Sequence, residues 1–170
     1  PNHQTGRVTS LKTRGITAMA GTFGYELNPA LLSDEEKEEI REQIKTFKKY
    51  EMLINEGTYW RLTSPFEDEV AAAKDRALVS VVRLYAEANA AACYVKLKGL
   101  ESDAVYIEEN TGRQYTGAAL MNAGIPLPFA VKEYEAYQFS FIRLDEAKKL
   151  YDEIKKVCGN LKIVLLITVL

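Results

Sequence analysis

The hydrophobic pattern of this 170-residue chain changes its period at Gly57. Before that glycine, apolar residues recur at the spacing of one helix face: Ile40, Ile44, Phe47, Tyr50 and Ile54. From Thr58 onward, apolar and polar residues alternate. A period of 3.6 favours an amphipathic helix, whereas a period of two favours strands with one covered face. The sequence therefore predicts an α+β chain with a helical part up to Gly57 and a β part after it.

The helix before Gly57 carries start and stop signals. Ser33 precedes three acids and stands three residues before Glu36, which is the spacing of a capping box. Acidic residues fill the first turns and lysines follow later, the order that the helix dipole favours. Ahead of this helix, the small apolar run GITAMAGTFG (residues 15–24) is typical of a buried strand. We therefore expect a strand followed by a helix.

The β part reads as a series of short strands separated by turns. The run at 77–86 is apolar on both faces, and 104–117 forms a hairpin that turns at residues 110–112. Val105 and Ile107 are expected to face the core. The link at 117–128 is helical or irregular. The remaining expected strands are 58–65, 92–100 and 136–144. Such a pattern predicts an antiparallel β-sandwich.

The last segment changes period again. A helical stripe follows Leu144 and is terminated by Gly159 and Asn160; its members are Ala147, Leu150, Tyr151, Ile154 and Val157. The run LKIVLLITVL (residues 161–170) then predicts a buried strand. It contains a lysine and is much shorter than the roughly 20 apolar residues that cross a bilayer, so we expect no membrane partner.

Composition excludes several classes of protein. A net charge of −2 and a pI near 5.6 argue against nucleic-acid binding, which needs surplus Lys and Arg on one face. The N-terminus lacks the pattern of a signal peptide. Cys93 and Cys158 lie far apart, which favours free thiols in a reducing compartment and predicts a cytoplasmic protein.

No group of residues forms a recognisable active site. His3 is the single histidine, so a multi-histidine metal site is excluded, and no metal or cofactor is expected. Neither a GxSxG elbow nor a GxGxxG loop is present. The acidic runs at 35–39 and 67–69 are interpreted as a solvated helix start and a surface loop, because catalytic carboxylates must face each other across a sugar from separate elements. The aromatic residues Tyr137, Phe139 and Phe141 favour a core face over a sugar platform.

Four stretches carry a resemblance to a known family: PNHQTGR, GTFGYEL, RLTSPFE and LMNAGIPLP. Through them, residues 1 to about 144 resemble the end of bacterial α-galactosidases of glycoside hydrolase family 36. The resemblance implies three parts. Residues 1–57 would be the last strand and helix of a (β/α)8 barrel, 58–144 an antiparallel β-sandwich C-terminal domain, and 145–170 an unassigned helix-strand tail. Two departures from the family pattern are a region at 67–76 shortened by roughly a strand and the tail itself.

The resemblance also implies an activity. Enzymes of this family hydrolyse terminal α-galactosides with retention, using two aspartates in motifs that lie upstream of the segment beginning at Pro1. Neither motif occurs here, so no catalytic residue is assigned and the chain is expected to be an inactive C-terminal fragment. Its partners would be α-galactoside sugars, bound through the parent catalytic domain. In a barrel the substrate lies at the C-terminal ends of the strands, which nominates as substrate-binding residues Asn2, His3, Gln4, Gly21 and Thr22.

Two alternatives stay open. In the first, the chain is a non-catalytic carbohydrate-binding or oligomerisation β domain. In the second, it is a self-contained hydrolase that uses Glu67, Asp68 and Glu69. By resemblance the parent enzymes often assemble, so a homo-oligomer is also considered.

Overall fold

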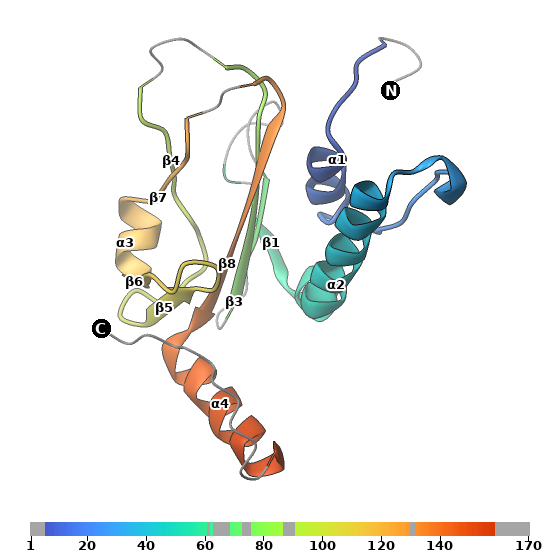
Figure 1. Cartoon of the computed structure of the whole chain (residues 1–170). Helices are drawn as coiled ribbons and strands as arrows, with labels where there is room; N and C mark the ends of the chain where they lie inside the picture. Colours follow the sequence, from blue (N-terminus) through green and yellow to red (C-terminus); the bar gives the residue numbers. More distant parts are fainter. Residues whose placement is uncertain are drawn as a thin grey trace.

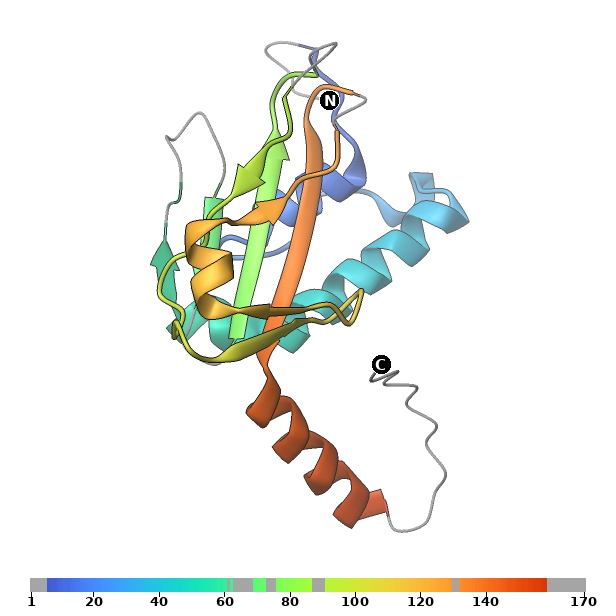
Figure 2. The ribbon, with the colours of Figure 1, turned by 90° about the vertical axis from the view of Figure 1, so that its left-hand side faces the viewer.

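The structure is a computed structural model of the whole chain, and it describes residues 6–60, 62, 69–72, 76–86, 91–129 and 132–158. An antiparallel sheet forms its centre, with strands in the order β1-β2-β3-β8-β5-β6 (Figure 1). The strands are β1 (Thr58–Trp60), β2 (Glu69–Ala72), β3 (Arg76–Arg83), β8 (Glu135–Arg143), β5 (Val105–Glu108) and β6 (Gln114–Thr116). The longest pairing joins β3 to β8, from Arg76 opposite Ile142 to Arg83 opposite Glu135. Figure 2 shows these two strands side by side, in green and orange, with α4 continuing beyond the end of β8.

Different elements cover the two faces of the sheet (Figure 1). On one face lie helix α3 (Gly117–Asn122) and a small ladder of β4 (Tyr94–Val95) with β7 (Ile125–Pro126). On the other face lie α1 (Leu11–Ala18) and α2 (Asp34–Glu56). This double cover explains why β3 is apolar on both faces, as the sequence predicted.

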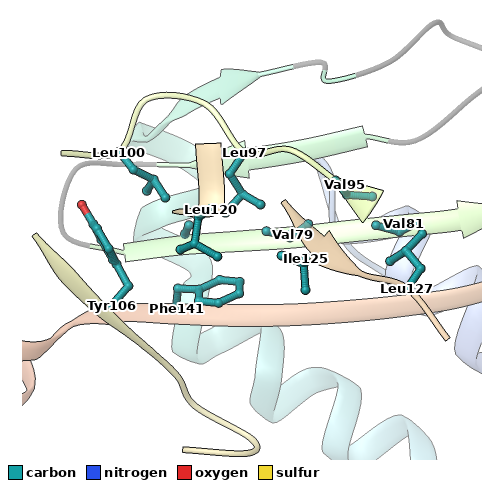
Figure 3. Packing of buried hydrophobic residues seen from close by; sticks show 11 residues of the cluster. Val79, Val81, Val95, Leu97, Leu100, Tyr106, Leu120, Ile125, Leu127 and Phe141 are labelled. Carbon is teal, nitrogen blue, oxygen red and sulfur yellow. The ribbon is translucent and has the colours of Figure 1, made fainter. Parts of the chain in front are cut away.

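The main core fills the space between the sheet and the α3 side (Figure 3). Val79, Val81 and Phe141 enter it from β3 and β8 and are fully buried, and Leu97 and Leu120 meet them from the opposite layer. Each such side chain contributes about 1.5–3 kcal/mol through burial. Tyr137 and Phe139 are partly buried against the same cluster, so the predicted core role of this aromatic face is confirmed.

Helix α2 matches its prediction closely. Ser33 accepts a hydrogen bond from the Glu36 backbone N–H, and the Glu36 carboxylate accepts from the Ser33 N–H, which completes the capping box. The helix ends at Glu56, and the Gly57 N–H donates to the Leu53 carbonyl. A short 3-10 turn (Pro29–Leu31) precedes it.

The strand predicted over residues 15–24 is wrong, because Gly15 to Ala18 belong to α1 and the chain then turns. A buried parallel strand needs a hydrogen-bonding neighbour on each side, whereas a helix satisfies its own backbone. The Ser10 side chain accepts from the Thr13 N–H and caps α1 at its start. Short apolar runs do not distinguish the two structures, and the local cap is consistent with the helix.

The predicted hairpin forms between β5 and β6, but its core face is the opposite of the expected one. Tyr106 and Glu108 are buried at 0% and 4% exposure, while Val105 and Ile107 are half-buried. Glu108 occupies a buried position because its carboxylate accepts hydrogen bonds from the Asn110 and Thr111 backbone N–H groups at the turn. Tyr106 receives a bond from the Glu101 N–H at its hydroxyl, so its polar end is satisfied as well.

The other expected elements have mixed outcomes. Strand β2 lies inside the shortened region and pairs with β1 and β3, so the sheet is continuous there. Helix α4 (Leu144–Cys158) confirms the predicted helical stripe. The expected strand over 161–170, the terminators Gly159 and Asn160, and the acids Glu67 and Asp68 lie outside the described residues. Among the helices that the structure describes, none has the length and apolar character needed to cross a membrane.

Candidate functional site

Two of the five predicted sugar-contacting residues lie within the described part of the chain. Gly21 and Thr22 are both exposed in the turn that follows α1, and the Gly21 N–H donates to the Ala18 carbonyl at 3.3 Å. A Cβ placed at Gly21 would meet no atom within 4 Å, so the backbone is open to an approaching molecule. Asn2, His3 and Gln4 lie outside the described residues.

Helix α1 is held against the end of β8, which fixes where the Gly21 turn lies. The Thr13 hydroxyl donates to the Tyr134 carbonyl at 2.7 Å, and the Arg7 guanidinium lies 4.3 Å from the Tyr134 ring centroid. Met19 is buried at 2% exposure, and its sulfur accepts a hydrogen bond from Gln138 at 3.7 Å. The turn is thus attached to the sheet through residues before, within and after α1.

The residues after Thr22 are attached to α2 by aromatic and amide contacts. The Phe23 ring stacks on Phe47 with centroids 4.9 Å apart and meets Tyr25 edge-on at 5.2 Å. The Tyr25 hydroxyl donates to the buried Gln43 side chain at 2.6 Å, and Gln43 in turn donates to the Leu11 carbonyl at 3.2 Å. Burial, with the nearby Glu39 charge, raises the pKa of Tyr25. Gln43 therefore links α1, the Gly21 turn and α2 in one network.

A second polar cluster, made of Lys49, Tyr50, Glu109 and Ser140, connects α2 to the sheet. Lys49 Nζ lies 2.9 Å from the Glu109 carboxylate, which also accepts a hydrogen bond from the Tyr50 hydroxyl. The Glu109 N–H donates to the Ser140 carbonyl at 2.9 Å. Burial opposes ionisation of Glu109, but the hydrogen bonds from Tyr50 and Lys49 outweigh it and lower the pKa of the carboxyl. Burial and the bond to Glu109 raise the pKa of Tyr50.

Sequence reasoning did not identify this cluster, because Glu109 follows Lys49 by 60 positions and Tyr50 by 59. The available signal was the helical stripe that contains Tyr50. It predicted that this face of the helix is covered, but it did not identify the residues that cover it. The cluster's chemistry is structural. Lys49, Tyr50 and Glu109 join α2 to the sheet through these bonds, and Lys49 is the one member that also lines the groove described next.

An open groove of about 550 Å³ lies between the second half of α2 and the first turns of α4. Its apolar lining includes Met52 and Leu53 from α2, Ile142 from β8, and Leu150 from α4. Glu56, Glu146 and Glu153 are on its walls together with Lys49, Arg76 and Lys149. Glu146 is paired with Lys149 at 2.7 Å and lies 3.7 Å from Arg143, so this acid is held in surface ion pairs.

The described residues include no candidate metal site. Within them, no three His, Cys, Asp or Glu side chains converge to hold a metal ion. Glu35 and Glu38 are exposed at the start of α2, where Glu38 pairs with Arg41 at 2.7 Å, in agreement with a solvated helix start. Cys93 is a half-buried free thiol.

Comparisons with known proteins give a consistent assignment. The family model described as Melibiase matches residues 1–57, and the model described as Glycosyl hydrolase family 36 C-terminal domain matches residues 69–141. The bifunctional α-galactosidase/sucrose kinase AgaSK of Mediterraneibacter gnavus is 71% identical over 167 residues, which cover 94% of this chain and 18% of that protein. The α-galactosidase AgaA of Geobacillus stearothermophilus is 45% identical over 140 residues, covering 79% of this chain and 19% of that protein.

Solved structures agree. The galactosidase domain of AgaSK superposes with a TM-score of 0.81 at 71% identity, covering 85% of this chain and 21% of that one. The crystal structure of AgaA superposes with a TM-score of 0.79 at 41% identity and the same coverage. The chain thus spans about a fifth of the length of the relatives it matches.

The alignment with AgaSK also corrects one expectation. Residues 1–144 are 144 of 170 residues, or 85% of the chain, so an alignment covering 94% extends into α4. The resemblance therefore does not end at Leu144. These matches and the antiparallel fold establish that the chain belongs to glycoside hydrolase family 36 and corresponds to the C-terminal part of its α-galactosidases.

Proposed function

We propose that the chain is the C-terminal portion of a retaining α-galactosidase and has no hydrolytic activity alone. The observation that carries the proposal is the 71% identity to AgaSK over 94% of this chain but only 18% of that protein. Retaining hydrolysis needs two carboxyl groups about 5–5.5 Å apart on either side of the glycosidic bond. Among the described acids, Glu36 caps α2, Asp34 and Glu38 form surface ion pairs, and Glu109 pairs with Lys49, so none of these four is available as one of the pair.

We propose that residues 1–57 belong to the catalytic barrel of the whole enzyme, 58–144 to its C-terminal β-sandwich domain, and 145–170 to a tail. The two family models support a division in this region, because one ends at residue 57 and the other begins at residue 69. The structure supports it too, since α2 ends at Glu56 and β1 begins at Thr58.

Within the whole enzyme, we propose that Asn2, His3, Gln4, Gly21 and Thr22 contribute to the wall of the sugar pocket. The open backbone at Gly21 supports this role, because a hydroxyl-rich ligand reaches backbone amides most easily where no side chain intervenes. Crystal structures of AgaA variants in complex with raffinose and with stachyose show that related enzymes hold galactosides. The ligands of this chain's parent are therefore proposed to be α-galactosides of this class.

The test is hydrolysis of a chromogenic aryl α-galactoside by the purified chain at high concentration, with full-length AgaA as the positive control. We expect no turnover above a buffer blank. Turnover that copurifies with the chain through two further columns and is lost in a Glu67, Asp68, Glu69 triple glutamine variant would overturn the proposal in favour of a self-contained hydrolase.

A binding measurement separates the proposed role from that of an independent sugar-binding module. Trp60 is 37% exposed on β1 and reports on its surroundings by fluorescence. Titration with raffinose is expected to give a linear, non-saturating change. A saturable change that is also seen by calorimetry would contradict a role that depends on the rest of the enzyme.

For the cellular setting, we propose the cytoplasm, supported by the free Cys93 thiol. Light scattering of the purified chain measures whether copies assemble.

A further inference from the structure

Helix α4 presents apolar side chains that no neighbouring element in the described part of the chain covers fully. Leu150 is 43% exposed and Ile154 is 38% exposed. Figures 1 and 2 show α4 extending away from the sheet from the end of β8. An amphipathic helix normally buries its apolar face, so this face and the adjoining groove are suited to an occupant.

The groove beside α4 has an apolar floor with charged walls. Met52 and Leu53 approach from α2, Ile142 closes the sheet end, and Leu150 approaches from α4, enclosing about 550 Å³. Met52 lines this hollow and is 74% exposed. The apolar part of the lining suits an aliphatic segment, and the charged residues on the walls can pair with a charge that the segment carries.

We propose that residues 161–170 of the same chain, LKIVLLITVL, bind in this groove. Eight of these ten residues are aliphatic, which matches the groove floor. Two residues, Gly159 and Asn160, separate them from the end of α4, and both types tolerate the positive φ that reverses a chain after a helix. The segment thus begins next to the helix whose apolar face it would cover.

The length and the charge of residues 161–170 are both compatible with binding in the groove. The distance along α4 from Cys158 back to Glu146 is about 18 Å at a helical rise of ~1.5 Å per residue. Ten extended residues span about 33 Å, which is enough to return past Glu146 to the sheet end of the groove. The only charged residue of the segment is Lys162, and Glu153 lies on the α4 wall where a returning chain would first pass.

Lys162 makes the proposal testable on the intact chain, because trypsin cleaves after it and releases residues 163–170. The rate of this release is followed by mass spectrometry under native conditions. Leu150→Asp places a charge in the groove and is expected to speed release about tenfold, the low end of the effect of losing one buried leucine. Tyr151→Asp is the matched control, since Tyr151 is equally exposed on the same helix but does not line the groove. It is expected to leave the rate unchanged.

Circular dichroism of both variants establishes that α4 is retained. Met52→Asp places a charge on the α2 side of the groove without altering α4, and it is also expected to speed the release of residues 163–170. Equal release rates for the wild type, Leu150→Asp and Met52→Asp would overturn the proposal. Protection that depends on protein concentration would also overturn it, by assigning the groove to a segment of a second copy.

Discussion

The Tyr50 hydroxyl donates a hydrogen bond to the Glu109 carboxylate and thereby connects helix α2 to the end of strand β5. Tyr50 is 3% exposed, while Lys49 approaches the same carboxylate from the solvent side at 2.9 Å. This contact crosses from the part of the chain matched by the Melibiase model to the part matched by the family 36 C-terminal model. It is therefore a direct link between two regions that belong to different family models.

Tyr50→Phe is expected to lower the free energy of unfolding by about 1–2 kcal/mol, because it removes a hydrogen bond to a partly buried carboxylate and leaves the ring in place. Urea denaturation followed by far-UV circular dichroism measures the change. Tyr151→Phe on the exposed face of α4 is the matched control and should alter stability by less than ~0.5 kcal/mol. Equal effects of the two variants would show that the bond to Glu109 contributes nothing.

The same cluster should make stability depend on pH. Because its neighbours lower the pKa of the Glu109 carboxyl below the ordinary 4.5, its ionised form is favoured in the folded state. The resulting stabilisation is fully present above pH 4.5 and is lost as the pH falls through the lower, folded-state value. The difference in unfolding free energy between the wild type and Glu109→Gln is therefore expected to shrink as the pH is lowered below 4.5. Denaturation series at neutral and acidic pH would refute this if the difference stayed constant or grew.

Local signals allowed α2 to be predicted from the sequence, whereas contacts between residues distant in the sequence could not be predicted. Ser33, Glu36 and Gly57 lie within or beside the helix that they delimit, so its ends were predictable. The Gly15 run was assigned to a strand because small apolar residues fit either structure and the choice depends on neighbours. The sugar-contacting role of Gly21 and Thr22 stays a prediction. The Tyr50–Glu109 contact could not be predicted, since nothing near either residue specifies the other.

The inverted face of the β5–β6 hairpin has a similar physical cause. Alternation assigns apolar residues to the core, which selects Val105 and Ile107. Glu108 instead lies in the buried position because the turn amides satisfy its carboxylate. A buried charge is tolerated when it accepts several hydrogen bonds, and hydropathy patterns do not encode that compensation.

Glu108 is consequently expected to be a stability determinant. Glu108→Ala leaves the Asn110 and Thr111 N–H groups without their side-chain acceptor and should cost about 2–3 kcal/mol. Glu108→Gln keeps one acceptor oxygen and should cost less. Thermal unfolding gives the order of the three proteins, and hydrogen exchange at the two amides locates the effect. A loss in the Gln variant as large as that in the Ala variant would contradict this expectation, because the one remaining acceptor oxygen would then contribute nothing.

Substitutions at Gly124 and Gly112 separate the effect of a steric clash from the effect of backbone strain. Both have positive φ, +85° and +71°, so alanine strains the backbone at either position by about 1–2 kcal/mol. At Gly124 the added Cβ would also lie 2.6 Å from the Val95 carbonyl oxygen, whereas at Gly112 it would meet no atom within 4 Å. Gly124 precedes β7, whose pairing with β4 covers the core, so the clash must separate these two short strands. We therefore expect Gly124→Ala to lower the melting temperature clearly more than Gly112→Ala and to speed amide exchange at Val95 and Ile125. Equal losses at the two positions would mean that β4 and β7 separate without cost and that this side of the core tolerates the displacement.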